Sequence, residues 1–376
     1  MKIALFSPFP PYRGGISNDS VNLYYEFIKE HEVDLYNFKR QYPSFLFPGK
    51  TQYIDNNQNT NFPSQRIIDI MNPLSWDLMV NKVIKNNYDV LVIRYWHPFF
   101  AFCYTWICKS IRKKNSHIKI VSLCDNIIPH EYFPLKKKLV KRYLDSLDGA
   151  ITFSKNVQNE LLAIKNNIYN KTLFLPIQKG LPEPMDYYDS QSKIGINNKF
   201  TLLFFGLIRP YKGLDIFLKS LSKIDKKYRN SFQFLIVGEN YENNNKYFKL
   251  ITKYNLANNV RWIDRFISNS EISLYFSACD YVVIPYKEAS QSAVIPMAYF
   301  YNKPIIVNNV TGINEQLIEN KTGYIYNDDK ELIEIIEDLI RNKDNSQMLL
   351  NDIIEYKESI STKKLCKNII EFIDEI

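Results

Sequence analysis

Residues 281–307 read YVVIPYKEASQSAVIPMAYFYNKPIIV, and this stretch decides the fold class. It begins and ends with apolar runs of strand character, and between them lies a helical pattern with Pro296 in its first turn. Two strands joined through a helix need a crossover connection, which makes the strands parallel. The stretch therefore predicts an α/β unit built on a parallel sheet.

The same alternation of apolar runs and helical patterns continues through the whole chain. In the first half, runs of strand character cover residues 2–7, 32–38, 89–95, 118–124 and 149–154. In the second half, they cover residues 200–206, 233–238, 260–264, 281–286, 303–307 and 323–326. The helical patterns between them, such as those at 18–30 and 99–113, predict two doubly wound units in succession.

The length of 376 residues favours two domains over a single core. A polar stretch with several prolines, residues 179–198, is expected to link them. We therefore expect an N-terminal domain over residues 1–178 and a C-terminal domain over residues 199–360. A last amphipathic helix, about 361–376, is expected to pack back on the N-terminal domain. Because ligands bind beyond the carboxyl ends of parallel strands, we expect the site in a cleft between two facing sheets.

The composition is that of a globular protein, with 45% hydrophobic and 23% charged residues. The five cysteines are scattered and the four histidines form no helical pair, so the sequence predicts no metal site and no bound cofactor. The apolar runs are too short for a signal-peptide core or a membrane span. We expect a cytoplasmic protein, either soluble or peripheral on the inner face of the membrane.

The net charge of +8 is concentrated in the first half of the chain. Residues 1–180 hold 24 Lys and Arg against 14 Asp and Glu. One basic stretch, residues 134–147, also carries apolar residues at helical spacing. It is either a solvated helix packed on its domain or a face that contacts anionic lipid headgroups. Nucleic-acid binding is not expected, because the basic stretches lack interleaved aromatic residues.

Two loops that follow predicted strands have the character of phosphate-binding loops. Gly14 and Gly15 directly precede a helix, where backbone N–H groups can approach an anion, although a tight turn needs the same residues. Arg209 and Lys212 follow the strand that ends at Gly206. A forked guanidinium and an ammonium at such a place can neutralise a diphosphate, whereas the alternative is an ordinary basic surface loop.

The opening stretch contains a third candidate, the small polar loop before its helix. Its residues are Ser290, Gln291, Ser292, Ala293 and Val294. Serines are good N-caps, and a proline in the first turn lacks an N–H that would be unpaired there anyway. We expect the amides at 292–294 to be unpaired and to hold an anion, most simply a phosphate.

These motifs in this order resemble the retaining, nucleotide-sugar-dependent glycosyltransferases of GT-B fold, the large family (glycosyl transferases group 1) that includes bacterial polysaccharide and lipopolysaccharide transferases. The resemblance spans nearly the whole chain and is most specific over residues 200–326, which contain GLIRPYKG, LIVGEN, QSAVIPMAYFYNKPIIV and TGINEQLIENKTGYIY. It implies that Arg209, Lys212 and the amides at 292–294 bind the donor diphosphate. It also implies that Gly14 and Gly15 approach the same phosphates or the acceptor.

The chain departs from the family at positions where the family often carries functional side chains. The family's two glutamates would fall on Ala289 and Met297, with Glu288 one place from the first and still able to reach the donor sugar. The slot of a histidine near the transferring sugar is held by Asp125. We expect at least one of His97, Asp125 and His130, all on loops after strands, at the reaction centre.

The resemblance implies a retaining, metal-independent hexosyltransferase. The donor would be a nucleoside-diphosphate sugar, and the acceptor a glycan or a polyprenyl-diphosphate-linked glycan of surface polysaccharide biosynthesis. Two alternatives remain open. One is a GT-B epimerase or hydrolase, and the other is a catalytically degenerate nucleotide-sugar-binding partner protein. Neither the sugar nor the base follows from the sequence.

Overall fold

The computed structural model describes residues 1–43, 52–54, 62–128, 135–177, 179–196, 199–242, 244–342 and 348–376. The chain forms two compact units. Unit 1 consists of Met1–Pro176 with Thr362–Ile376, and unit 2 consists of Ile177–Ser361. The chain therefore crosses from one unit to the other twice, and the C-terminal segment returns to the unit in which the chain began.

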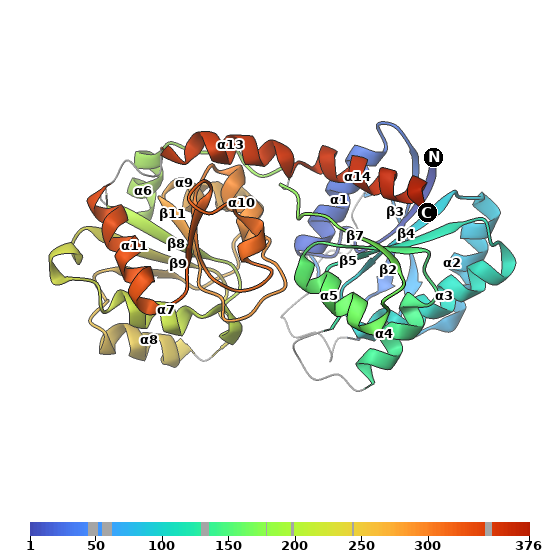
Figure 1. Cartoon of the computed structure of the whole chain (residues 1–376), viewed down its shortest axis with the longest axis horizontal. Helices are drawn as coiled ribbons and strands as arrows, with labels where there is room; N and C mark the ends of the chain where they lie inside the picture. Colours follow the sequence, from blue (N-terminus) through green and yellow to red (C-terminus); the bar gives the residue numbers. More distant parts are fainter. Residues whose placement is uncertain are drawn as a thin grey trace. The chain divides into compact units, whose positions relative to one another are not determined.

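Unit 1 is built on a seven-stranded parallel sheet of order β3-β2-β1-β4-β5-β6-β7 (Figure 1). Its strands are β1 (Lys2–Phe6), β2 (Glu32–Arg40), β3 (Ser64–Asp69), β4 (Val90–Tyr95), β5 (Lys119–Cys124), β6 (Gly149–Thr152) and β7 (Tyr169–Thr172). Its helices are α1 (Gly15–Phe27), α2 (Pro73–Asn86), α3 (Ala101–Lys114), α4 (Lys136–Leu144), α5 (Lys155–Ile164) and α14 (Thr362–Glu375), with a short 3-10 helix, η2 (Pro98–Phe100), before α3. The strand order reverses between β1 and β4.

Two separate cores cover the two faces of this sheet. Alternate residues of a strand point to opposite faces, so Ile3 and Leu5 of β1 join one core while Ala4 and Phe6 join the other. The first core is closed by α1 and α14, and the second by α2, α3, α4 and α5. Strands buried on both faces read as continuous apolar runs, which is why the central strands are recognisable in the sequence.

Helix α14 belongs to the core of unit 1 although it lies at the end of the chain. Leu365, Ile369 and Phe372 are buried there, and the ring of Phe372 lies 5.2 Å from that of Tyr169 on β7. A Cβ at Gly149 would lie 2.7 Å from the Phe372 ring, so glycine allows the close approach of helix and sheet. The structure thus places the last helix on the first unit.

Unit 2 is built on a six-stranded parallel sheet of order β10-β9-β8-β11-β12-β13 (Figure 1). Its strands are β8 (Phe200–Phe205), β9 (Phe232–Val237), β10 (Val260–Ile263), β11 (Tyr281–Ile284), β12 (Ile305–Asn308) and β13 (Gly323–Tyr326). Its α-helices are α6 (Tyr187–Ile194), α7 (Leu214–Leu221), α8 (Asn244–Lys253), α9 (Asn269–Ser277), α10 (Val294–Phe300), α11 (Asp329–Arg341) and α13 (Leu350–Ser359). Its 3-10 helices within the described residues are η3 (Pro210–Lys212), η4 (Lys226–Tyr228) and η5 (Asn314–Gln316). The strand order reverses between β8 and β11.

The segment expected to link the domains differs from that expectation. Most of residues 179–198 belongs to unit 2, and part of it forms helix α6, which packs against α9. Asp186 caps the helix by accepting a hydrogen bond from the Asp189 amide, and Gly195 ends it with a φ of 77°. The side-chain amide of Gln191 donates to the Ala278 carbonyl at 3.1 Å. Tertiary contacts therefore order a segment whose prolines and polar residues suggest a linker.

Among the residues that the structure describes, no helix combines the length and the apolar character needed to cross a bilayer.

Candidate functional site

The carboxyl edge of the unit 2 sheet gathers the predicted donor-site residues at the point where the strand order reverses. Arg209 and Lys212 follow β8, and residues 290–294 follow β11. Because β8 and β11 are adjacent, the chain leaves these two strands in opposite directions and opens a space beyond their ends. In open α/β sheets, ligands bind at such a reversal.

Glycines bring the backbones of four loops together at this edge. A Cβ on Gly213, whose φ is 70°, would overlap the carbonyl oxygen of Pro285 after β11. A Cβ on Gly238 would overlap the Gly206 carbonyl, and one on Gly312 would overlap that of Ser290. Only glycine permits these approaches, because the positions combine positive φ with backbone contact. The loops after β8, β9, β11 and β12 thus form one tightly packed platform.

Lys212 is a buried cation on this platform. Its side chain is 8% exposed, and its ammonium nitrogen lies 5.2 Å from the centre of the Tyr286 ring. The pKa of Lys212 is lowered, first by burial and also by the neighbouring Arg209, while Tyr211 opposes this shift. Within the described part of the chain, Lys212 forms no ion pair with a carboxylate. A cation buried without a counter-charge costs free energy, which makes Lys212 a candidate for binding an anion.

The position of the Lys212 ammonium is tied to both strands at the reversal. A Cβ on Gly206, at the end of β8, would lie 3.3 Å from the ammonium nitrogen and 3.8 Å from a methyl group of Val294. Tyr286 follows β11, and burial raises the pKa of its hydroxyl to about 12, so the ring stays neutral. The ammonium therefore lies between the end of β8 and the start of α10.

Arg209 lies three residues before Lys212 and is only partly buried. Its guanidinium carbon lies 4.7 Å from the centre of the Tyr241 ring, in the loop after β9. The Ile208 amide donates to the Glu239 carbonyl at 3.0 Å, which joins the loops after β8 and β9 beside it. No ion pair of Arg209 is found among the residues that the structure covers. Two cations thus share this edge, and each rests on a tyrosine ring.

The loop at 290–294 differs in part from the expectation of unpaired amides. The Ser292 amide donates to the Gln316 side-chain oxygen at 2.6 Å, and the Val294 amide donates to Ser292 Oγ at 3.3 Å. Gln316 also donates to the Ser292 carbonyl at 3.1 Å. The prediction is therefore wrong for the amides of 292 and 294, because a glutamine from η5 and the Ser292 hydroxyl already satisfy them.

The remaining residues of this loop differ in exposure and in hydrogen bonding. Ala293 is exposed just before α10, whose first residue is Val294. The Ser290 hydroxyl is buried and has no hydrogen-bond partner among the described residues. Gln291, next to it, is half-buried. A buried hydroxyl without a partner costs free energy unless a ligand or water pairs with it.

The two positions that correspond to the family's glutamates lie in different environments. Glu288 is exposed, in the loop directly after β11. Met297 is buried within α10 at 9% exposure, so the position of the second glutamate is part of the packed helix. A carboxylate on this loop can therefore come only from Glu288 among residues 286–297.

Unit 1 has its own candidate site at the β1/β4 reversal. Gly14 has a φ of 116° and caps α1 without a side-chain contact, and neither Gly14 nor Gly15 would bring a Cβ within 4 Å of another group. The first turn of α1 is thus open at the glycines. One turn away, the Ser17 hydroxyl is buried and has no hydrogen-bond partner among the described residues.

Asp125, the predicted family histidine position, lies in a buried charge cluster. Arg94 on β4 is 1% exposed and donates to both oxygens of Asp125, at 2.6 and 2.5 Å. A second carboxylate, that of Asp19 on α1, lies 3.5 Å from the same guanidinium, and the ring of Phe153 lies 4.8 Å away. Burial lowers the pKa of Arg94, but the two carboxylates outweigh it and the net shift is upward. Asp125 is thus held rigidly at the end of β5.

Of the two candidate histidines, the structure describes His97 but not His130. His97 is partly exposed directly after β4, and its Nδ1 accepts a hydrogen bond from the Phe99 amide at 3.1 Å, which fixes the ring at the start of η2. His130 lies outside the described residues. His97 and Asp125 follow neighbouring strands, so both lie at the carboxyl edge of the unit 1 sheet.

Several residues of these sites were not identified from the sequence. Tyr286 and Tyr241 hold the two cations of unit 2, Gln316 pairs with the Ser292 backbone, and Arg94 positions Asp125. An arginine inside an otherwise apolar strand, LVIRY, is a signal that was available, since charges are rarely buried without a partner. The described residues contain no group of three or more His, Cys, Asp or Glu side chains placed to hold a metal ion.

Comparisons with known proteins agree with this architecture. Residues 188–359 match the family model "Glycosyl transferases group 1". An uncharacterised glycosyltransferase of Methanocaldococcus jannaschii is 23% identical over 388 residues, covering 100% of this chain and 99% of that protein. The structure of HepE from Anabaena in complex with UDP is 16% identical, with a TM-score of 0.76 and full coverage of both chains.

A further solved structure is that of the lipopolysaccharide outer core galactosyltransferase WaaB, 13% identical, with a TM-score of 0.69 over 100% of this chain and 99% of that chain. At these identities the structures show the fold alone. They confirm the predicted fold of two doubly wound, Rossmann-like parallel-sheet domains. The matched segment and the shared fold together support a glycosyltransferase of GT-B fold.

Proposed function

We propose that the protein is a retaining glycosyltransferase of surface polysaccharide biosynthesis. It moves a hexose-type sugar from a nucleoside-diphosphate sugar to a glycan or a polyprenyl-diphosphate-linked acceptor. The observation that carries this proposal is the buried ammonium of Lys212, which has no carboxylate partner in the described residues and lies beside Arg209 at the β8/β11 reversal. A diphosphate supplies the negative charge that this place lacks.

In the proposed reaction, Arg209 and Lys212 stabilise the leaving diphosphate. As the bond between the sugar's anomeric carbon and the diphosphate oxygen breaks, negative charge grows on the diphosphate. Lys212 and Arg209 stabilise that charge more strongly than the charge of the intact donor, which lowers the barrier. The acceptor hydroxyl attacks the anomeric carbon from the same face, and its proton passes to the departing diphosphate. Configuration is therefore retained, and this scheme requires no metal ion.

Further groups have proposed roles around the sugar. Ser290, Gln291, Ser292, Ala293 and Val294 line the diphosphate. Ala293 is the exposed residue among them, and the Ser290 hydroxyl is buried without a hydrogen-bond partner among the described residues. Glu288, exposed after β11, reaches the donor sugar.

In unit 1, Gly14 and Gly15 contact the phosphates or the acceptor. At least one of His97, Asp125 and His130 acts at the reaction centre. The rigid pairing of Asp125 with Arg94 supports Asp125 in that role, because it fixes the carboxylate at the carboxyl end of β5.

The comparisons support the chemical class of donor and acceptor. HepE, which shares the fold, binds UDP, and UDP is the nucleoside diphosphate left when a UDP-sugar donates its sugar. WaaB, by its name, adds galactose to lipopolysaccharide, which is a surface glycan. We therefore propose a nucleotide-sugar donor for this chain, with UDP as the first nucleotide to test.

The test is a thermal-shift titration with UDP, GDP and ADP and then with the common UDP- and GDP-sugars. A ligand that binds only the native state raises the melting temperature by mass action. We expect a rise with one nucleotide in the wild type and no rise in Arg209→Ala/Lys212→Ala. The matched control is Lys226→Ala/Lys249→Ala, which removes two exposed cations of unit 2 away from this edge and should keep the rise.

Product analysis with and without acceptor then separates the enzymes that share this fold. Sugar transfer that requires an acceptor supports the proposal. Hydrolysis or epimerisation of the donor without acceptor would instead identify a hydrolase or an epimerase. Nucleotide binding with no turnover of any sugar donor would identify a nucleotide-sugar-binding partner protein.

A further inference from the structure

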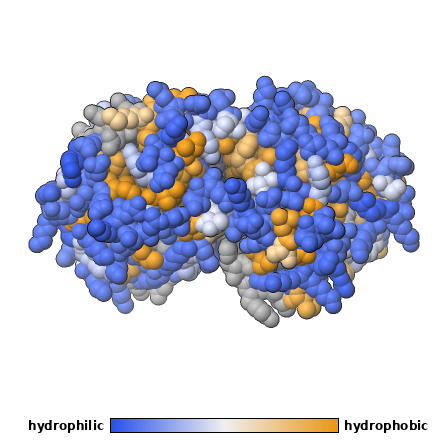
Figure 2. Space-filling model, in the orientation of Figure 1, coloured by the Kyte–Doolittle hydropathy of each residue, from blue (hydrophilic) through white to orange (hydrophobic). Residues whose placement is uncertain are grey.

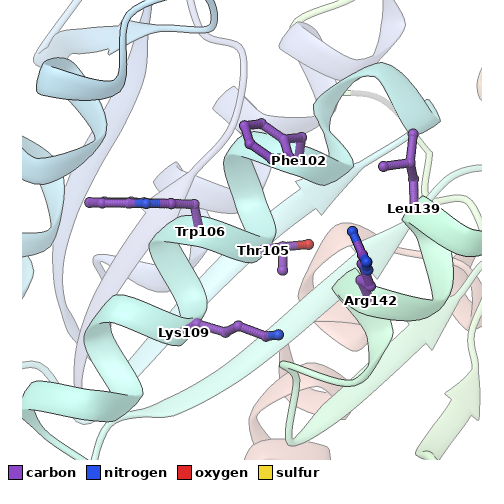
Figure 3. Close-up of a pocket in the computed structure, with 6 residues that line it drawn as sticks. All are labelled: Phe102, Thr105, Trp106, Lys109, Leu139 and Arg142. Atoms are coloured by element: carbon purple, nitrogen blue, oxygen red, sulfur yellow. The ribbon is translucent and has the colours of Figure 1, made fainter.

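Unit 1 contains a groove formed by residues 102–142, which are distant in sequence from the unit 2 residues proposed to bind the donor. It has a volume of about 290 Å³ and runs between α3 and α4 (Figure 3). Phe102, Thr105, Trp106 and Lys109 line it from α3, and Leu139 and Arg142 line it from α4. Figure 3 shows Lys109 extending from α3 toward α4, where Arg142 rises from the facing helix. Two cations thus border a space whose other walls are largely apolar.

The charged side chains of α3 and α4 are all positive. Together α3 and α4 contain nine Lys and Arg residues and no Asp or Glu. Arg112 and Lys141 pair with Asp148 and Asp145, which lie beyond the helices. Lys109 and Arg142 are exposed and have no ion pair within the described residues. The groove therefore carries positive charge for which the described side chains of unit 1 provide no ion pair at Lys109 or Arg142.

The same surface exposes large apolar side chains beside these cations. Phe102 is 61% exposed on α3, and Leu135, which directly precedes α4, is 72% exposed. Figure 2 shows hydrophobic residues interrupting the hydrophilic surface around α4. Apolar side chains next to basic ones are the pattern of proteins that lie on a membrane surface.

We infer that the groove between α3 and α4 is a docking site for anionic phospholipid at a bilayer surface. Lys109 and Arg142 bind the lipid phosphate, and Phe102, Leu135 and Leu139 enter the boundary between headgroups and acyl chains. Charge complementarity selects this occupant. A soluble phosphate would leave the exposed apolar side chains in water, and a protein partner would have to supply a uniformly acidic face.

This inference goes beyond the proposed sugar transfer and does not depend on it, because membrane docking has its own readout. It would, however, bring a lipid-linked acceptor to the same surface as the enzyme. A docked enzyme searches for such an acceptor in two dimensions.

The test is sedimentation of the full chain with vesicles of phosphatidylcholine, with and without phosphatidylglycerol. We expect binding to the anionic vesicles, little binding to pure phosphatidylcholine, and weaker binding as salt is raised. Each basic residue near an anionic surface contributes a fewfold change in partitioning, so Lys109→Gln/Arg142→Gln should bind about thirty-fold more weakly. The matched control, Lys226→Gln/Lys249→Gln, removes the same charge from unit 2 and should bind as the wild type does.

A second variant tests the apolar part of the site separately. Phe102→Ser keeps every charge and should also weaken vesicle binding, since it removes an exposed ring that would be buried in the bilayer. Failure of the wild type to sediment, or equal loss in the groove and control pairs, would overturn the inference. Complete competition by glycerol phosphate at constant ionic strength would also overturn it, because the groove would then be a site for a soluble phosphate.

Discussion

The two sheets each bury a cation at the reversal of strand order, but they treat it in opposite ways. In unit 1, Arg94 is held by the carboxylates of Asp125 and Asp19. In unit 2, Lys212 lies over the ring of Tyr286, and the described residues offer it no carboxylate. The same topological position therefore contains a cation paired with carboxylates in unit 1. In unit 2 it contains a buried cation without a carboxylate partner among the described residues.

The difference shows that burying the two cations affects the free energy of folding differently. A buried ion pair is satisfied within the fold, and its main effect here is to orient Asp125. A buried cation without a counter-ion opposes folding until a ligand arrives. Unit 2 thus keeps a buried positive charge that the described residues do not neutralise, whereas unit 1 presents a positioned carboxylate.

Removing the cation of unit 1 should have the largest effect on stability. Arg94→Met removes the guanidinium that pairs with the buried carboxylates of Asp125 and Asp19, so we expect the free energy of unfolding to fall by about 3–5 kcal/mol. Urea denaturation followed by circular dichroism measures this. Arg94→Met/Asp125→Asn should recover part of the loss, because one of the two buried charges is then removed. A loss below about 1 kcal/mol for the single variant would show that the cluster is not the electrostatic unit described above.

The glycine platform of unit 2 should show the next largest effect. Gly213→Ala introduces a Cβ that overlaps the Pro285 carbonyl, whereas Gly180→Ala has a similar positive φ, 76° against 70°, with no group within 4 Å. Both variants bear the strain of the left-handed conformation, about 1 kcal/mol. Gly213→Ala should lose about 1–3 kcal/mol more and also weaken nucleotide binding. Equal melting temperatures for the two variants would mean that the loops after β8 and β11 are not in close contact.

Removing the cation of unit 2 should have the smallest effect, and in the opposite direction. Lys212→Met replaces a buried ammonium with an apolar side chain, so we expect the nucleotide-free protein to gain about 1 kcal/mol. The folded pKa of Lys212 is lowered, so the penalty applies at neutral pH and fades as pH rises through that pKa toward 10.5. Thermal melts of variant and wild type should therefore converge at high pH. A variant less stable than the wild type at pH 7 would show that the ammonium already has a stabilising partner.

The strands of the fold could be read from the sequence except at the edges of one sheet. The central strands are apolar runs because both of their faces are buried, and all six strands of unit 2 fall within one or two residues of the predicted ranges. Strands β3 and β7 were missed. Both are edge strands of unit 1, and their sequences, SQRIID and YNKT, are largely polar. An edge strand is held by backbone pairing on one side and needs no continuous apolar run.

The sequence showed which candidate residues follow the strands but not what those residues contact. A strand followed by Arg209 and Lys212 locates two cations, because loops after parallel strands share one edge of the sheet. The sequence could not show that Gln316 satisfies the Ser292 amide from 24 residues away. It also could not show that Asp125 is paired with Arg94, 31 residues earlier. Such pairings depend on which strands become neighbours.

By itself, then, the sequence determined the class of fold, the two-unit organisation and the places where charge follows a strand. Periodicity and punctuation by glycine and proline are local properties, so a linear pattern is enough to reveal them. Only the tertiary structure decided which of those charges are neutralised, which amides are already bonded, and that α3 and α4 together form a cationic groove. Burial and pairing arise from residues distant in the chain, and they become fixed only when the strands and helices pack.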